Sequence, residues 1–465
     1  MKPRKNTMKK LSVLMTLLTT VASATVHFPF PQNISYDYGY NLTSVSASRL
    51  KEAFEIWWGN FYVENGNYAR IKFDDPNYTV SEGIGYGMLL AVYMSSDTTS
   101  YQDEFDKLWA YYNNFLDDNG LMHWKIDGFS QVNQTGAATD AELDVAVALI
   151  MAYYQFGDEN YKTDALNLLE KIKTYEVDNN YVLKPGDMWD DKKNPSYFSY
   201  FGLKLFAAFD SENASFWNNV VNATFEDVLE NQSAAGISSD WYAPNNPTDT
   251  LSTDMSYDAI RTPWRIALGY AWWGGQDAET YLDKALATFG NTSVSLVNDK
   301  IDYETGTFTG TWNNATFVGG VGSIFMRSSA YASQLTAYYN NLENDQDWDI
   351  SNSYFGGAFD IIYRLTFSGN MPNFMAMSEH TEDNTVPITD FSLERNSSGE
   401  LQIRISVTDS ETDHSYQILS TESLSDPDWQ EISDAIAGNG TMLQIEITAD
   451  SGQTNGFYKL EARPF

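Results

Sequence analysis

Apolar residues recur at helical spacing through most of this chain and at strand spacing only near its end. Between about residues 45 and 370, segments with an apolar residue every three or four positions alternate with loops rich in Gly, Asn, Asp and Pro. The pattern predicts about a dozen helices, at 47–62, 82–94, 101–116, 142–156, 161–175, 197–209, 215–231, 260–273, 278–290, 321–341 and 354–366. Helical hairpins in this number favour a mainly α toroid with an inner and an outer ring, although an α-solenoid has the same periodicity.

The last part of the chain has a different pattern. Residues 375–388 are polar and acidic, which predicts a linker between a helical domain at 25–374 and a second domain at 389–465. Period-two alternation at 401–407 and 442–447, with shorter runs at 416–419 and 457–460, predicts a small antiparallel β-sandwich. Sugar binding, a spacer role and surface attachment remain open for it. Trp429 is either a core residue or a sugar-stacking ring, and the core is the commoner place for a tryptophan.

The first residues are typical of a secretory signal. Five basic residues precede an apolar stretch at 11–21 and the small residues Ala22, Ser23 and Ala24. We therefore expect residues 1–24 to be removed and the protein to be secreted or extracellular, with or without attachment to the cell surface. The remaining sequence contains no run of eighteen or more apolar residues, so we expect no integral membrane role.

The composition argues against several classes of partner and cofactor. The formal net charge of -35 repels phosphate backbones, which argues against a nucleic-acid partner but leaves neutral polysaccharides unaffected. Solubility alone is the simpler explanation of such a charge. The chain has no cysteine and only four scattered histidines, without HExxH spacing, so we expect no metal and no other cofactor. A monomer is the default expectation.

Three acids each stand at the predicted start of a helix. Glu82 lies in Ser-Glu-Gly-Ile-Gly-Tyr-Gly-Met, Asp140 ends Ala-Thr-Asp, and Asp258 begins Asp-Ala-Ile-Arg. In a toroid the inner helices begin at one rim, so the three acids are expected to converge on one cleft. Inverting hydrolysis of a glycosidic bond requires an acid and a base about 6.5 to 9.5 Å apart.

Helix capping is the alternative explanation for these acids. Asp is a preferred N-cap and acids favour the positive end of the helix dipole, which explains Asp140 and Asp258 without chemistry. Glu82 fits that explanation less well, because Ser81 already supplies a cap and glycines follow at 83, 85 and 87. A general acid must stay protonated, so we expect another acid within a few ångströms of Glu82. Arg261, one turn after Asp258, is expected to hold that carboxylate ionised, or else to form a purely structural pair with it.

Aromatic residues are candidates for stacking against sugar rings. Trp124, Trp189, Tyr197 and Tyr354 lie in or beside loops, and Tyr257 is expected to face the substrate. Each one taken alone is more often a core residue.

Five ordered motifs within residues 28–374 resemble glycoside hydrolase family 8. They are Ser-Glu-Gly-x-Gly-Tyr-Gly-Met at 81–88, Ala-Thr-Asp at 138–140, Asn-Pro-Ser-Tyr-Phe at 194–198, Tyr-Asp-x-x-Arg-x-Pro-Trp-Arg at 257–265, and Tyr-Phe followed by Ser-Gly-Asn at 354–370. The resemblance implies an (α/α)6 barrel and an inverting enzyme that cuts β-linked polysaccharides. It also implies that Glu82 is the general acid, that Asp258 is the general base, and that Asp140 grips and distorts the sugar.

The same resemblance bears on the substrate. Asp258 argues against the branch that takes its base from elsewhere, typically chitosanases, and Gly85 looks more like the cellulase form of the first motif than the xylanase form. We therefore expect a secreted endo-β-1,4-glucanase acting on cellulose or a related β-glucan. An endo-β-1,4-xylanase or mixed-linkage β-glucanase of the same family is the nearest alternative. An inactive carbohydrate-binding protein, in which the acids only cap helices, is a more distant one.

Overall fold

The computed structural model describes residues 26–382 and seven later strand segments, at 388–395, 401–407, 414–421, 430–431, 436–437, 443–449 and 457–464. It divides into two compact units with the boundary between Asn370 and Met371. The predicted signal at 1–24 and Trp429 lie outside the described residues.

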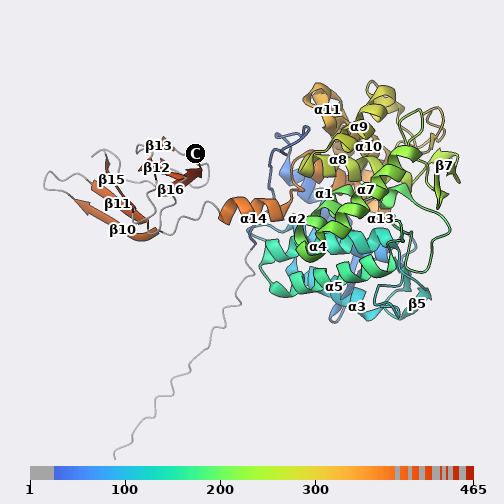
Figure 1. The fold of residues 1–465 in the computed structure, drawn as a ribbon, viewed down its shortest axis with the longest axis horizontal. Helices are drawn as coiled ribbons and strands as arrows, with labels where there is room; N and C mark the ends of the chain where they lie inside the picture. Colours follow the sequence, from blue (N-terminus) through green and yellow to red (C-terminus); the bar gives the residue numbers. More distant parts are fainter. Residues whose placement is uncertain are drawn as a thin grey trace, which may run out of the picture. The chain divides into compact units, whose positions relative to one another are not determined.

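Six helices of the first unit form a closed inner ring. Each contacts the next, and the last returns to the first. Nearly all their residues are buried because they pack on every side, which explains why their sequences are apolar all round. They are α2 (Ser81–Met94), α4 (Thr139–Phe156), α6 (Tyr200–Phe209), α8 (Thr262–Trp273), α10 (Ala315–Ser323) and α13 (Tyr354–Phe367). Figure 1 labels α2, α4, α8, α10 and α13 among them.

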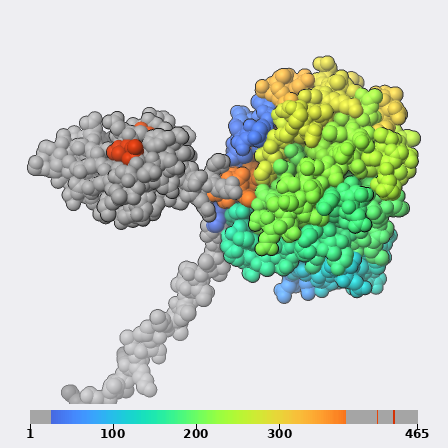
Figure 2. All heavy atoms as spheres, in the orientation of Figure 1, coloured from blue at the N-terminus to red at the C-terminus, as the bar shows by residue number. Residues whose placement is uncertain are grey.

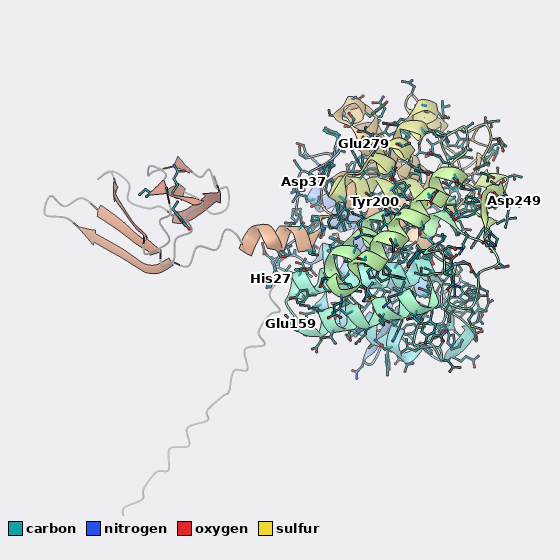
Figure 3. All side chains as sticks on the ribbon, in the orientation of Figure 1. His27, Asp37, Glu159, Tyr200, Asp249 and Glu279 are labelled. Carbon is teal, nitrogen blue, oxygen red and sulfur yellow. The ribbon has the colours of Figure 1, made fainter. Side chains whose placement is uncertain are left out.

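Six further helices pack outside this ring and bury only one face. Helix α9, for example, buries Ala278, Leu282 and Phe289 on one stripe. Figure 3 labels Glu159 and Glu279, which belong to two of these outer helices. The outer helices are α1 (Ala47–Phe61), α3 (Gln102–Asn114), α5 (Glu159–Tyr175), α7 (Ala214–Asn231), α9 (Gln276–Phe289) and α11 (Ala332–Asp345).

The first unit is therefore a helical toroid built from successive hairpins, as the periodicity predicts. In Figure 2 the teal, green and yellow parts of the chain follow one another across one face, because hairpins adjacent in sequence are adjacent in space. None of the helices in the described part of the chain has both the length and the apolar character that crossing a membrane requires.

Short strands and 3-10 turns carry the chain into the inner helices. The strand β3 (Tyr78–Val80) runs directly into α2 and pairs with β4 (Lys125–Asp127), which pairs with β5 (Gln131–Gln134). Before α8, β8 (Asp254–Met255) pairs with β9 (Ile301–Asp302), and a 3-10 turn follows at Ala259–Arg261. The other hairpins are β1 (Tyr62–Asn65) with β2 (Tyr68–Ile71) and β6 (Tyr242–Ala243) with β7 (Asn246–Thr250). The segments between the helices thus contain more strands and 3-10 turns than the sequence predicts.

One predicted helix, at 321–341, is wrong. Helix α10 ends at Ser323, two 3-10 turns follow, and α11 begins only at Ala332. The start of α10 was missed because its glycines lower helix propensity. Close packing explains them: a Cβ on Gly319 would come within 1.7 Å of the Tyr363 ring.

The second unit begins with a helix and continues with strands. Helix α14 (Phe374–Glu382) occupies much of the segment expected to be a linker. The strands β10 (Ile388–Arg395), β11 (Leu401–Val407) and β15 (Leu443–Ala449) form one antiparallel sheet, and β12 (His414–Thr421) pairs with β13 (Gln430–Glu431), β14 (Ile436–Ala437) and β16 (Phe457–Pro464) in another. The packing of the two sheets as a sandwich stays a prediction.

Candidate active site

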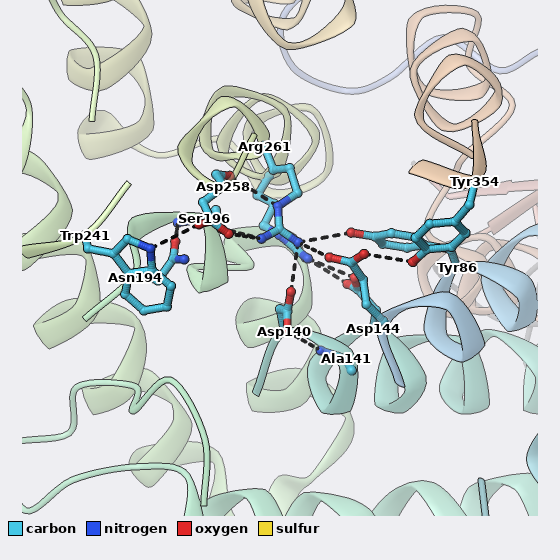
Figure 4. Close-up of polar contacts among 12 residues, drawn as sticks. Tyr86, Asp140, Ala141, Asp144, Asn194, Ser196, Trp241, Asp258, Arg261 and Tyr354 are labelled. Carbon is cyan, nitrogen blue, oxygen red and sulfur yellow. Dashed lines mark hydrogen bonds and ion pairs between the residues drawn. The ribbon is translucent and has the colours of Figure 1, made fainter. Parts of the chain in front are cut away.

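Arg261 is the centre of the polar cluster at the start of the inner helices (Figure 4). Its Nη1 donates to Glu82 Oε2 at 2.7 Å and to Asp140 Oδ2 at 2.8 Å. Its Nη2 donates to Ser196 Oγ at 2.9 Å and to Asp258 Oδ1 at 3.3 Å. The structure therefore brings together three acids that are far apart in sequence, on one guanidinium whose side chain is only 2% exposed.

The N-cap position does not account for these acids, although Asp140 Oδ1 accepts a hydrogen bond from the Ala141 N–H at 3.0 Å in the first turn of α4. Glu82 and Asp140 are the second residues of α2 and α4, whose N-cap positions are Val80 and Ala138. Asp258 precedes the 3-10 turn, and its side chain makes no capping hydrogen bond within the described part of the chain. The expectation that Ser81 caps α2 is also wrong, because its buried hydroxyl has no hydrogen-bond partner among the described residues.

Glu82 has the environment of a proton donor. Its side chain is 18% exposed, and Oε1 accepts a hydrogen bond from the Tyr354 hydroxyl at 2.8 Å. Burial raises the pKa of Glu82 to about 7, with Asp140 and Asp258 adding to the rise while Arg261 and Tyr354 oppose it. Burial beside other acids thus outweighs the helix dipole, which favours the ionised form.

Asp258 is the most open of the three acids. Its side chain is 38% exposed, against 5% for Asp140. Its Oδ2 accepts a hydrogen bond from Trp241 Nε1 at 3.1 Å, so each carboxylate oxygen has a donor that fixes its direction. This carboxylate is both oriented and accessible to water.

Sequence reasoning missed two residues that support Asp258. Trp241 is half-buried, and the ammonium of Lys192 lies 3.6 Å from its ring centroid. Asp240 accepts hydrogen bonds from the backbone N–H groups of Ser256 at 2.8 Å and Ala259 at 2.9 Å, and so holds the turn that carries Asp258. Burial raises the pKa of Asp240 to about 6. No periodicity marks either residue, because both belong to a loop.

Four predicted aromatic residues retain exposed surface. Trp189 is 37% exposed, and the Tyr197 ring centroid lies 5.7 Å from the Arg261 guanidinium. Tyr257 is half-buried beside Asp258. Trp124 is half-buried and accepts a backbone hydrogen bond from Ser81 at 2.9 Å, directly before Glu82. These positions suit rings that line a cleft.

Tyr354 differs from this group because its side chain is fully buried. Its contact with substrate stays a prediction, and in the structure its hydroxyl donates a hydrogen bond to Glu82 Oε1. A Cβ on Gly83 would lie 3.1 Å from the Tyr354 ring, so the glycine gives this tyrosine access to the acid. Arg261 is also buried, and its N–H groups donate hydrogen bonds to the three acids.

A second ion pair lies one helical turn further into the barrel. Arg265 of α8 donates two parallel hydrogen bonds to Asp144 of α4, at 2.7 and 2.8 Å. Both side chains are buried, and the pair fixes the relative positions of the helices that begin near Asp140 and Arg261.

The chemistry available here is that of carboxyl groups. No group of three or more side chains suited to a metal ion occurs among the described residues. A neutral acid, an oriented carboxylate and a shared guanidinium can transfer protons to and from a bound ligand. The fold and the cluster define an enzyme of the acid–base type on a double ring of helices.

Comparisons with known proteins agree with this class. A sequence model of the glycosyl hydrolases family 8 matches residues 29–367. Endoglucanase 2 of Ruminiclostridium josui is 36% identical over 79% of this chain and 83% of its own length. Endoglucanase C of Ruminiclostridium cellulolyticum is 33% identical over 78% of this chain and 81% of its own length.

A solved structure supports the fold. The apo β-1,3-1,4-glucanase from Paenibacillus sp. X4 superimposes with a TM-score of 0.68 at 24% identity, over 74% of this chain and 98% of that chain. This chain belongs to glycosyl hydrolase family 8, and its first unit is an (α/α)6 barrel.

Proposed function

We propose that this protein is a secreted, inverting endo-β-1,4-glucanase that hydrolyses cellulose or a related β-glucan. The observation that carries the proposal is the pairing of Glu82, whose pKa is raised to about 7, with the accessible Asp258 on one guanidinium. An acid that is protonated near neutral pH beside an ionised carboxylate is the combination that inverting glycoside hydrolysis needs. Relatives named endoglucanases, similar over most of the chain, support the choice of glucan.

The proposed reaction uses each acid once. Glu82 donates its proton to the glycosidic oxygen as the bond from that oxygen to the anomeric carbon breaks. Asp258 removes a proton from a water molecule whose oxygen bonds to the anomeric carbon from the opposite face. Asp140 holds the sugar at the cleavage point, and Trp124, Trp189, Tyr197 and Tyr257 stack against neighbouring rings. The acid and the base then return to their starting states by proton exchange with solvent.

Two substitutions test the roles of Glu82 and Asp258. We expect Glu82→Gln and Asp258→Asn each to lower kcat by a factor of at least about 100 with the fold intact, since general acid–base groups contribute roughly that much. Tyr38→Ala, near the far end of α8, is the control. Substantial activity in Glu82→Gln would contradict its role.

Two further measurements test substrate and stereochemistry. Initial rates on mixed-linkage β-glucan, carboxymethyl cellulose, xylan and chitosan separate a glucanase from a xylanase, and no turnover of any of them favours a binding protein. Proton NMR of the first product should show the α-anomer from a β-linked chain, and a β-anomer would exclude inversion.

Two parts of the proposal concern regions beyond the barrel. Secretion is supported by the basic and apolar pattern at 1–24, and mass spectrometry of the exported protein should show Thr25 as the first residue. A sandwich arrangement of the C-terminal sheets is supported by two antiparallel sheets with alternating strands, such as β11 and β15.

A further inference from the structure

Two tryptophans of the barrel unit form an exposed pair that the acid cluster does not use. Trp312 is 43% exposed and Trp348 is 58% exposed. Their ring centroids are 5.3 Å apart, and the ring planes meet at 78°. Trp312 belongs to the loop before α10, and Trp348 belongs to the short helix α12 (Asp347–Asn352). Large apolar side chains that gather in solvent mark interaction sites more often than single exposed ones do.

Hydrogen bonds connect this pair to the rim of the proposed cleft. Asn314, the N-cap of α10, donates to the Tyr257 hydroxyl at 3.3 Å and to the Trp312 carbonyl at 3.4 Å. Asp349, the neighbour of Trp348, accepts a hydrogen bond from the backbone N–H of Ala315 at 2.9 Å. Both tryptophans are therefore within two residues of groups that hold the start of α10, and Tyr257, which accepts the hydrogen bond from Asn314, directly precedes Asp258 in the chain.

The backbone that carries the rings is fixed although the rings are exposed. Asp299 Oδ1 accepts hydrogen bonds from the N–H groups of Thr311 and Trp312, each at 2.9 Å. The Asp299 N–H donates to the Trp312 carbonyl at 2.8 Å, and Asn352 donates to the Trp348 carbonyl at 3.0 Å. Backbone held in place before a ligand arrives loses little conformational entropy on binding.

We propose that Trp312 and Trp348 bind a neutral β-glucan chain outside the catalytic cleft, at the part of its rim that contains Tyr257. Sugar rings present apolar C–H faces, and flat indoles are suited to stack against them. The occupant is a neutral polymer rather than an anionic one, because Asp299 and Asp347 lie beside the pair in a chain of net charge -35. This inference rests on the proposed function, since the bound polymer is the substrate that continues beyond the cleft.

Affinity electrophoresis tests the proposal without turnover. The full chain carrying Glu82→Gln is run in native gels containing mixed-linkage β-glucan, and Trp312→Ala, Trp348→Ala and the double variant are added to it. We expect the double variant to bind at least about tenfold more weakly, because aromatic side chains that a ligand covers often dominate its binding energy. Tyr38→Ala is the matched control. Tyr38 is also an exposed aromatic residue, at 46%, but it packs on Tyr270 near the C-terminal end of α8, whereas the acid cluster lies at the start of that helix. Circular dichroism checks that each variant is folded.

Kinetics of variants that keep Glu82 separate the contribution of the Trp312–Trp348 pair from that of the catalytic cleft. For the double variant, we expect kcat/KM to fall at least fivefold on the polymer and to stay unchanged on cellotetraose. If the double variant binds the polymer as tightly as the unsubstituted chain, the proposal that Trp312 and Trp348 bind β-glucan is overturned, while the proposed function is not affected. If the unsubstituted chain neither binds nor cuts any β-glucan, the proposed function itself fails. A dimer in sedimentation that the double variant abolishes would assign the pair to self-association and also overturn the proposal.

Discussion

At the scale of single residues, one cation serves three acids. Arg261 contacts Glu82, Asp140 and Asp258, so its charge balances only one of the three carboxylates if all are ionised. A proton on Glu82 removes one of the two unbalanced negative charges, which adds to the effect of burial in raising the pKa of that group. The arrangement therefore keeps one acid neutral while still orienting the exposed carboxylate of Asp258.

Tyr354 contributes to the pH range over which Glu82 can act, together with the larger effects of burial and Arg261. Its hydroxyl donates to Glu82 and lowers the pKa that burial has raised to about 7. Glu82 works in its protonated form, so activity is lost as the pH rises through this pKa. Removing the hydroxyl in Tyr354→Phe should raise the pKa and move the alkaline limb of kcat/KM to higher pH.

The pH–rate profile of Tyr354→Phe has a control on the same helix. Tyr363 of α13 is also fully buried, and its hydroxyl has no hydrogen-bond partner in the described part of the chain. Tyr363→Phe should leave the alkaline limb where it is. A limb for Tyr354→Phe at unchanged or lower pH would count against the role given to the hydroxyl.

Trp241 orients the proposed base and should affect kcat more than KM. Trp241→Phe keeps a ring beneath Lys192 but removes the hydrogen bond to Asp258 Oδ2. Hydrogen bonds to charged groups contribute about 1.5–3 kcal/mol, so kcat should fall roughly 10- to 100-fold. Steady-state kinetics on mixed-linkage glucan measure this effect.

The matched control for Trp241→Phe is Trp273→Phe. Trp273 is also half-buried, and its indole N–H donates to the Phe201 carbonyl at 3.3 Å near the far end of α8. It should leave kcat unchanged. A selective rise in KM for Trp241→Phe would indicate a sugar contact and not the orientation of the base.

At the scale of secondary structure, the sequence predicted the helices better than the segments between them. Amphipathic outer helices such as α5 and α9 match their predicted ranges closely, because one buried face leaves a clear period. Inner helices are apolar all round, and although α2 and α13 begin within one residue of the predicted positions, the start of α10 and its break from α11 were missed. Helix starts located Glu82, Asp140 and Asp258, whereas Trp241 and Asp240 lie in a loop whose path depends on tertiary contacts.

Helices α4 and α5 bury acids that should make the fold sensitive to alkali. Glu142 on α4 and Glu176 at the end of α5 are fully buried, and Glu142 accepts a hydrogen bond from the Tyr112 hydroxyl. Burial and the neighbouring Glu142 raise the pKa of Glu176 well above its ordinary value of 4.5. Below pH 4.5 both the folded and the unfolded chain hold this proton, so it does not affect stability there. Above that pH only the unfolded chain releases it, and the free energy of unfolding falls as pH rises.

Glu176→Gln should remove part of that pH dependence. The amide has the shape of the protonated acid and cannot ionise, so the variant should gain stability over the original chain between pH 5 and 8. A gain of about 1 kcal/mol raises the melting temperature of a domain of 150–250 residues by roughly 2–4 °C, and the larger barrel unit should shift by less. Thermal unfolding across this pH range measures it, with exposed Glu212→Gln as the control. A melting difference that does not change with pH would argue against ionisation of Glu176 as the cause.

At the scale of the whole molecule, the residues proposed to act on substrate all lie in the first unit. They span positions 82 to 348, and the boundary between the units follows Asn370. A chain ending at residue 382 keeps the buried Met371 and Phe374. Its kcat/KM on soluble β-glucan should stay within about twofold of the full chain, since the bond-breaking groups are unchanged. A loss of tenfold or more with the melting temperature preserved would show that the strands contribute to catalysis.

The net charge predicts how the enzyme responds to salt on different polymers. Carboxymethyl cellulose is a polyanion, and a chain of charge -35 repels it over a distance set by ionic strength. The screening length shortens from about 30 Å at 0.01 M salt to about 10 Å at 0.1 M, so added NaCl weakens this repulsion. We expect kcat/KM on carboxymethyl cellulose to rise severalfold over that range, while kcat/KM on neutral mixed-linkage glucan changes little. Equal salt responses on the two polymers would mean that the surface charge acts on solubility and not on substrate encounter. The comparison also bears on the choice of assay. Repulsion should lower the rate on carboxymethyl cellulose in dilute buffer, so a low rate there is no evidence against a glucanase.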